Sequence, residues 1–181
     1  LPVFAAQTLH GGPHTLGWLS GASGVGALAS ALSLAWRKTV VGLTRLLRVS
    51  AAVLGAALIV FGLSHTLWLS LVAMVFAGFG LIQIASASNT VIQTLVPEDK
   101  RARVMSYYTM TFFGAAPVGS LFAGILAERI GAGATVVLTG TVCLAGALWF
   151  SIQLPGLREV MRPIYVEMGL IRKETVDGVV R

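Results

Sequence analysis

The sequence contains few charged residues. Lys, Arg, Asp and Glu together make up 11% of its 181 residues, whereas a soluble domain carries about 25%. Apolar residues make up 56% of the chain, and the mean hydropathy is +0.84. The chain has too few charges to cover a soluble globule and is too apolar to be intrinsically disordered. These values predict an integral membrane protein.

Residues for catalysis and metal binding are also scarce. The one cysteine, Cys143, has no partner for an intramolecular disulfide, and with three scattered histidines it cannot form a zinc site. Residues 21–24 spell the Gly-x-Ser-Gly of intramembrane rhomboid proteases, but no later span contains a histidine to activate Ser23. We therefore expect no enzyme, no cofactor and no metal. An intramembrane hydrolase stays only as a third hypothesis.

Long charge-free runs predict the membrane spans. A spanning helix needs about 20 mostly apolar residues. We expect an all-α polytopic membrane helix bundle over residues 1–154, in which Pro155 ends the last helix and residues 155–181 form a cytoplasmic tail. The bundle would contain an apolar stub at 1–9 and spans at about 15–35, 46–63, 67–95, 104–127 and 132–154.

Basic residues gather on one side of this topology. The positive-inside rule makes that side cytoplasmic, together with the carboxyl terminus, and makes the turn at Arg129 external. The net charge of +6 is then a topology signal, and no nucleic-acid partner is expected. The basic residues on the predicted cytoplasmic side are Arg37, Lys38, Arg45, Arg48, Lys100, Arg101, Arg103, Arg158, Arg162, Arg172, Lys173 and Arg181.

Small residues recur at intervals of four within the spans, which predicts close helix packing. Pro117 lies in the middle of the fourth span and would permit a kink there, because it removes a backbone hydrogen bond. The stripes include Gly17/Gly21 and Ala22/Gly26/Ser30 in the first span, Ala115/Gly119/Ala123 and Ala116/Ser120/Gly124 in the fourth, and Thr139/Cys143/Ala147/Ser151 in the fifth.

The third span carries most of the polar side chains. Helical spacing places them on one broad face, which predicts either a water-filled pathway or hydrogen bonds to a neighbouring helix. No carboxylate lies deep in any span, so the chain offers none for proton coupling. The polar face consists of Gln83, Ser86, Asn89, Thr90 and Gln93, and the fourth span adds Tyr107, Tyr108, Thr109 and Thr111 near its cytoplasmic end.

Residues 89–131 carry a set of linked motifs. A polar Asn-x-x-x-Gln ends the third span, Val-Pro-x-x-x-Arg-x-Arg-Val follows, and the next helix contains Gly-Ala-Ala-Pro-Val-Gly and ends in Ala-Glu-Arg-x-Gly. This order resembles the carboxyl-terminal half of major facilitator superfamily transporters, in particular the exporter branch that includes enterobactin, drug and macrolide exporters. The residues at 1–5 and 15–28, and those at 162–170, also resemble this branch.

The resemblance implies helices eight to twelve, plus the end of helix seven, of a twelve-helix transporter in the bacterial inner membrane. It implies efflux of small amphipathic molecules, such as siderophores or drugs, by alternating access. The amino-terminal six-helix half is absent from this sequence and would be the main partner besides the lipid bilayer and the substrate. The alternative is a membrane scaffold or truncated remnant that does not transport.

The resemblance also assigns residues to roles. A cytoplasmic loop with Glu98, Asp99, Arg101 and Arg103 would form part of a charge cluster that latches one conformation, although these charges could equally set topology alone. Gln83, Ser86, Asn89 and Gln93 would line the substrate cavity. Gly114, Pro117, Gly119 and Gly124 would form the kink and packing motif of helix eleven.

Overall fold

The computed structural model describes residues 13–37 and 42–167, with side chains over 14–37 and 42–153. The predicted stub at 1–9, Lys38, Arg172, Lys173 and Arg181 lie outside the described residues. Within the described ranges the chain forms an all-α bundle of five helices, each long and apolar enough to cross a membrane. The helices are α2 (Pro13–Ala35), α3 (Leu43–Leu63), α4 (Leu67–Leu95), α5 (Glu98–Ile130) and α6 (Ala132–Glu167).

Two predicted helix boundaries are wrong. Glu98 and Asp99 were expected in a loop, but they form the first turn of α5, directly after the N-cap residue Pro97. Acidic side chains stabilise a helix N-terminus through its dipole, so the helix begins with the charged segment. Pro155 was expected to end the last helix, but α6 continues to Glu167. A proline deletes one backbone hydrogen bond, which a 36-residue helix can lose without ending.

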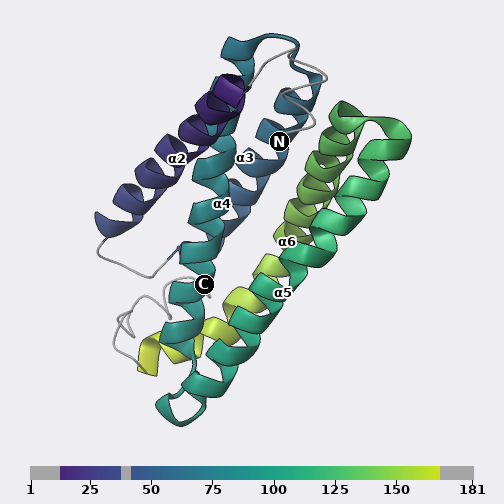
Figure 1. Ribbon diagram of the computed structural model, residues 1–181. Coiled ribbons are helices and arrows are strands. Elements are labelled where there is room, and N and C mark those ends of the chain that lie inside the picture. The colour runs from purple at the N-terminus through teal and green to yellow at the C-terminus, as the bar shows by residue number, and fades with distance from the viewer. Residues whose placement is uncertain (1–12, 38–41, 168–181) are drawn as a thin grey trace.

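The helices form an open row whose spatial order differs from their order in the chain. Contacts link α2 to α4, α4 to α3, α3 to α6 and α6 to α5, and α5 touches α4 only briefly (Figure 1). Because successive spans reverse direction, α2 and α4 run in the same direction, separated in the chain by α3. We call α2, α4, α3 and α6 the packed row.

Glycines bring the backbones of the packed row together. A Cβ on Gly26 of α2 would overlap the carbonyl oxygen of Val75 in α4, and a Cβ on Gly78 would overlap that of Ser23. Gly55 of α3 and Gly140 of α6 approach each other in the same way, with a Cβ on either lying within 3 Å of the other's carbonyl oxygen. These approaches follow the small-residue packing of membrane helices.

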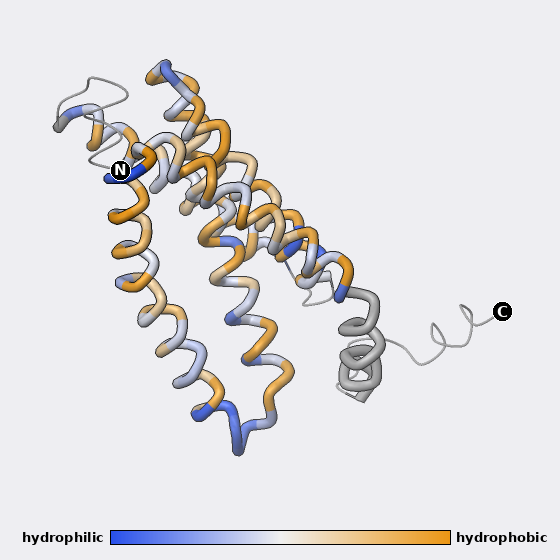
Figure 2. Tube along the Cα trace, turned by 90° about the vertical axis from the view of Figure 1, so that its right-hand side faces the viewer, coloured by the Kyte–Doolittle hydropathy of each residue, from blue (hydrophilic) through white to orange (hydrophobic). Residues whose placement is uncertain are grey.

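The outside of the bundle is apolar, and its ends are polar. Figure 2 shows hydrophobic residues along the helices and hydrophilic residues at the turn between α4 and α5. A small core of Leu19, Phe61, Ala73, Met74 and Ala132 lies between helices of the packed row. Helix α5 stands apart in the same view, and none of its residues is buried. The lipid bilayer is the solvent that such an apolar exterior requires.

Candidate functional site

The polar face of α4 divides into two parts. Gln83 is 1% exposed and lies between α4 and α2, where its side-chain oxygen accepts a hydrogen bond from the hydroxyl of Ser30. The Ser33 hydroxyl lies 3.2 Å from the same oxygen and 2.7 Å from the Ser30 carbonyl oxygen. Gln83 therefore links α4 to α2 by hydrogen bonds. Of the two roles predicted for the polar face, a water-filled pathway or hydrogen bonds to a neighbouring helix, Gln83 has the second.

The part of the face nearest the turn into α5 remains open. The Gln93 side-chain amide donates to the Asn89 side-chain oxygen at 2.7 Å, and this pair is exposed. Ser86 and Asn89 are half-buried, and Thr90 turns its hydroxyl to the Ser86 carbonyl oxygen at 2.9 Å. Asn89 and Gln93 thus present polar groups to the open side of α4, one helical turn apart.

Aromatic side chains of α5 lie next to this open face. The Tyr108 hydroxyl donates to the Ala85 carbonyl oxygen at 3.1 Å, so α5 meets α4 one turn before Asn89. The Tyr108 and Phe112 rings stack with centroids 6.0 Å apart, and Phe112 meets Phe113 edge to face at 5.7 Å. Phe112 is 45% exposed. Together with Asn89 and Gln93, Tyr108 and Phe112 form what we call the α4–α5 face.

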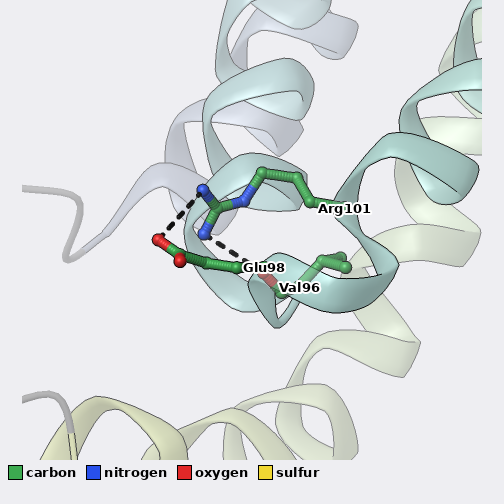
Figure 3. A network of polar contacts seen from close by, with 3 residues as sticks. All are labelled: Val96, Glu98 and Arg101. Carbon is green, nitrogen blue, oxygen red and sulfur yellow. Dashed lines mark hydrogen bonds and ion pairs between the residues drawn. The ribbon is translucent and has the colours of Figure 1, made fainter.

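The charged residues of the predicted gate lie at the turn from α4 to α5. Arg101 contacts Glu98 at 3.8 Å and donates to the Val96 carbonyl oxygen at 3.4 Å (Figure 3). Val96 is the C-cap residue of α4, so the guanidinium lies at the negative end of that helix dipole. Asp99 and Arg103 are exposed and form no ion pair within the described residues. The contacts of Arg101 are therefore local to its own turn.

The predicted packing motif of α5 has no neighbours within the described residues. A Cβ on Gly114, Gly119 or Gly124 would meet no atom within 4 Å. The helix continues through Pro117, whose carbonyl oxygen accepts a hydrogen bond from Ser120 at 2.8 Å. These small residues form a free surface on this chain.

The serine considered for hydrolysis is a packing residue. Gly78 of α4 contacts the backbone of Ser23 closely, and within the described ranges no hydrogen bond links Ser23 to a histidine.

The sequence pattern did not identify Phe112 and Phe113 as site residues, although they follow Tyr107 and Tyr108 by about one helical turn. It also could not identify Ser30 as the partner of Gln83, since 53 residues separate them.

Comparisons with known proteins agree with this architecture. The family model described as transmembrane secretion effector, of the major facilitator type, matches residues 1–165. The multidrug efflux pump Tap of Mycolicibacterium fortuitum is 32% identical over 149 residues, which are 82% of this chain and 36% of that protein. The pump of the same name from Mycobacterium tuberculosis is 32% identical over 155 residues, 84% of this chain and 36% of the relative.

The chain thus spans little more than a third of the length of these curated relatives. No solved structure matches. The family match covers nearly the whole chain, and five long apolar helices agree with it. The chain is therefore an integral membrane protein that belongs to the transmembrane secretion effector family of major facilitator transporters.

Proposed function

We propose that this chain is the carboxyl-terminal half of an efflux transporter and that the α4–α5 face forms its wall of the substrate pathway. The observation that supports this most directly is the exposed Asn89–Gln93 pair beside the aromatic side chains of α5. Polar amides at membrane depth are costly in lipid. A water-filled pathway between two halves of a transporter removes that cost.

The chemistry of the face indicates its substrate class. It combines amide groups with the aromatic rings of Tyr108 and Phe112, and neither α4 nor residues 104–127 of α5 contain a carboxylate. Aromatic rings bind apolar bodies and attract cations over their faces, while amides fix a few polar groups. The proposed substrate is a small amphipathic organic molecule, such as a drug or a siderophore.

The proposed mechanism is alternating access against an amino-terminal six-helix half. Helix α5 has no buried residues. The space beside Gly114, Gly119 and Gly124 contains no neighbouring atom within 4 Å, and the amino-terminal half would pack there. Glu98, Asp99, Arg101 and Arg103 would form the gate at the cytoplasmic end. The position of basic residues supports a cytoplasmic carboxyl terminus, and the similarity to bacterial efflux pumps supports a location in the bacterial inner membrane.

An efflux assay on the native transporter tests the pathway. Cells that express the double variant Asn89→Ala/Gln93→Ala should accumulate about tenfold more of a fluorescent amphipathic cation than wild-type cells, because each lost polar contact weakens substrate binding. The control is Ser106→Ala/Thr141→Ala, which removes two exposed hydroxyls that only bond their own helices. Unchanged efflux by the double variant at equal expression would contradict the proposal.

The mass of the native polypeptide separates this proposal from a scaffold or remnant. Immunoblotting of native membranes should give a band of roughly twice this chain's mass or more, as a twelve-helix transporter requires. A band at the mass of this chain alone would favour the scaffold.

A further inference from the structure

Two apolar grooves flank α3. One, about 530 Å³, lies between α3 and α6, and the other, about 350 Å³, lies between α3 and α4. Val53 and Ala56 line both grooves and lie between them. We call the groove between α3 and α6 the lateral groove.

The dimensions of the lateral groove fit an acyl chain. Its α3 lining extends from Arg48 to Ala56, which is about 12 Å at 1.5 Å per residue. One leaflet of the bilayer is about 15 Å thick, half of the hydrocarbon core. Ala52 and Ala56 are small enough to leave the groove open, while the larger, exposed side chains of Val49 and Leu148 form its edges.

Positive charge lies at one end of the lateral groove. Arg48 lines that end, and Arg45 lies one turn before Val49 on the same face of α3. Among the residues whose side chains the structure describes, neither guanidinium forms an ion pair. The first turn of α3 contains no acidic residue, and its N-cap Gly42 provides no side-chain cap. This end therefore combines two cations with the positive end of a helix dipole.

We propose that the lateral groove binds one anionic glycerophospholipid. One acyl chain lies between α3 and α6, and its phosphate binds Arg45 and Arg48. Charge complementarity selects a lipid over another helix, because a helix would leave both guanidinium groups unpaired. Basic pockets between membrane helices bind lipid head groups in the same way.

The lateral groove is separate from the proposed substrate pathway. Residues of α3 and α6 line the lateral groove, whereas Asn89 and Gln93 belong to α4. The inference does not depend on efflux, and loss of lipid binding would not by itself change the α4–α5 face.

Native mass spectrometry of the purified native transporter tests the proposal with phosphatidylglycerol as the probe. The variant Arg45→Gln/Arg48→Gln should retain about tenfold less phosphatidylglycerol than wild type, since it removes the two cations at the end of the groove where the phosphate would bind. The matched control Arg37→Gln/Arg103→Gln removes two charges that do not line the groove, and it should stay within about twofold of wild type. Equal retention by the two double variants would overturn the proposal.

A second variant keeps the charges and removes the space. Ala52→Phe places a ring inside the groove and should also lower phosphatidylglycerol retention severalfold, whereas Gly24→Phe, in open space on α2, should not. Wild-type protein should retain phosphatidylglycerol in preference to phosphatidylcholine. Equal retention of both lipids would show that Arg45 and Arg48 do not select the head group, and would also overturn the proposal.

Discussion

The packed row and α5 are built from similar sequences but behave differently. Both contain glycines at helical spacing, yet Gly26 and Gly78 lie against a neighbouring backbone while Gly114 and Gly119 have nothing within 4 Å. The packed row brings some of its small residues into backbone contact, although Gly17, Gly21 and Gly24 of α2 also lie in open space. In α5 none of Gly114, Gly119 and Gly124 has a neighbour within the described residues. The difference shows that a small-residue stripe predicts a contact but not the partner.

The largest effect is expected where the packed row is tightest. Gly26→Ala should destabilise the native protein by about 3 kcal/mol, because its Cβ would overlap the Val75 carbonyl oxygen and backbones must separate. Thermal unfolding in detergent, followed by loss of monodisperse protein, measures this. Gly24→Ala, in the same helix with open space around it, is the control. Equal stability of the two variants would show that α2 and α4 do not approach as described.

A smaller effect is expected at the buried glutamine, and it should separate stability from transport. Gln83→Met should lower the free energy of unfolding by about 1–2 kcal/mol, because it removes the hydrogen bond from Ser30 at near-constant volume. Gln93→Met should leave thermal stability unchanged and lower efflux instead. If Gln93→Met destabilised the protein as much as Gln83→Met, the division of the polar face would be incorrect.

A substitution in the hairpin between α3 and α4 should lower the free energy of unfolding by about 1 kcal/mol. Ser64 is 1% exposed, receives a hydrogen bond from Ser70 at 3.0 Å and donates to the Thr66 carbonyl oxygen at 2.9 Å. Ser64→Ala leaves these groups with fewer partners. Chemical denaturation in mixed micelles measures the change, against Ser106→Ala on α5, where the hydroxyl is exposed. A Ser64→Ala loss no larger than that of the control would contradict the hairpin geometry.

The smallest effect is expected at the turn into α5. Arg101→Gln should lower the free energy of unfolding by about 0.5 kcal/mol, because its partner Glu98 is 91% exposed and the pair is screened by solvent. The same thermal assay at low and high salt checks the value, with Arg103→Gln as the control. A loss of several kcal/mol would mean that Arg101 contacts more than its own turn.

The helices were predictable because each depends on local sequence. Charge-free runs predicted five long apolar helices, which the described residues contain. Pro97 followed by Glu98 and Asp99 could have indicated where α5 begins. The helix end expected at Pro155 was wrong. Pro155 removes only one backbone hydrogen bond, and the other hydrogen bonds of this 36-residue helix continue it to Glu167.

The contacts were less predictable because they depend on partners distant in the sequence. Gln83 and Asn89 share a polar face in the sequence pattern, yet Ser30 of α2 buries the first and leaves the second half-buried. The motif at Gly114 and Gly119 predicted a packed surface, but the residues that would cover it are not in this chain's described ranges. The gate and cavity roles stay predictions.

Thiol accessibility in the native transporter tests the central claim most directly. In a Cys143→Ala background, Gln93→Cys on the α4–α5 face and Leu148→Cys on the outer face of α6 would be exposed to a water-soluble maleimide. The account predicts fast labelling of Gln93→Cys, slowed by a transported compound, and negligible labelling of Leu148→Cys, which faces lipid. Equal labelling at the two positions, or labelling at Gln93→Cys that no transported compound slows, would contradict the account.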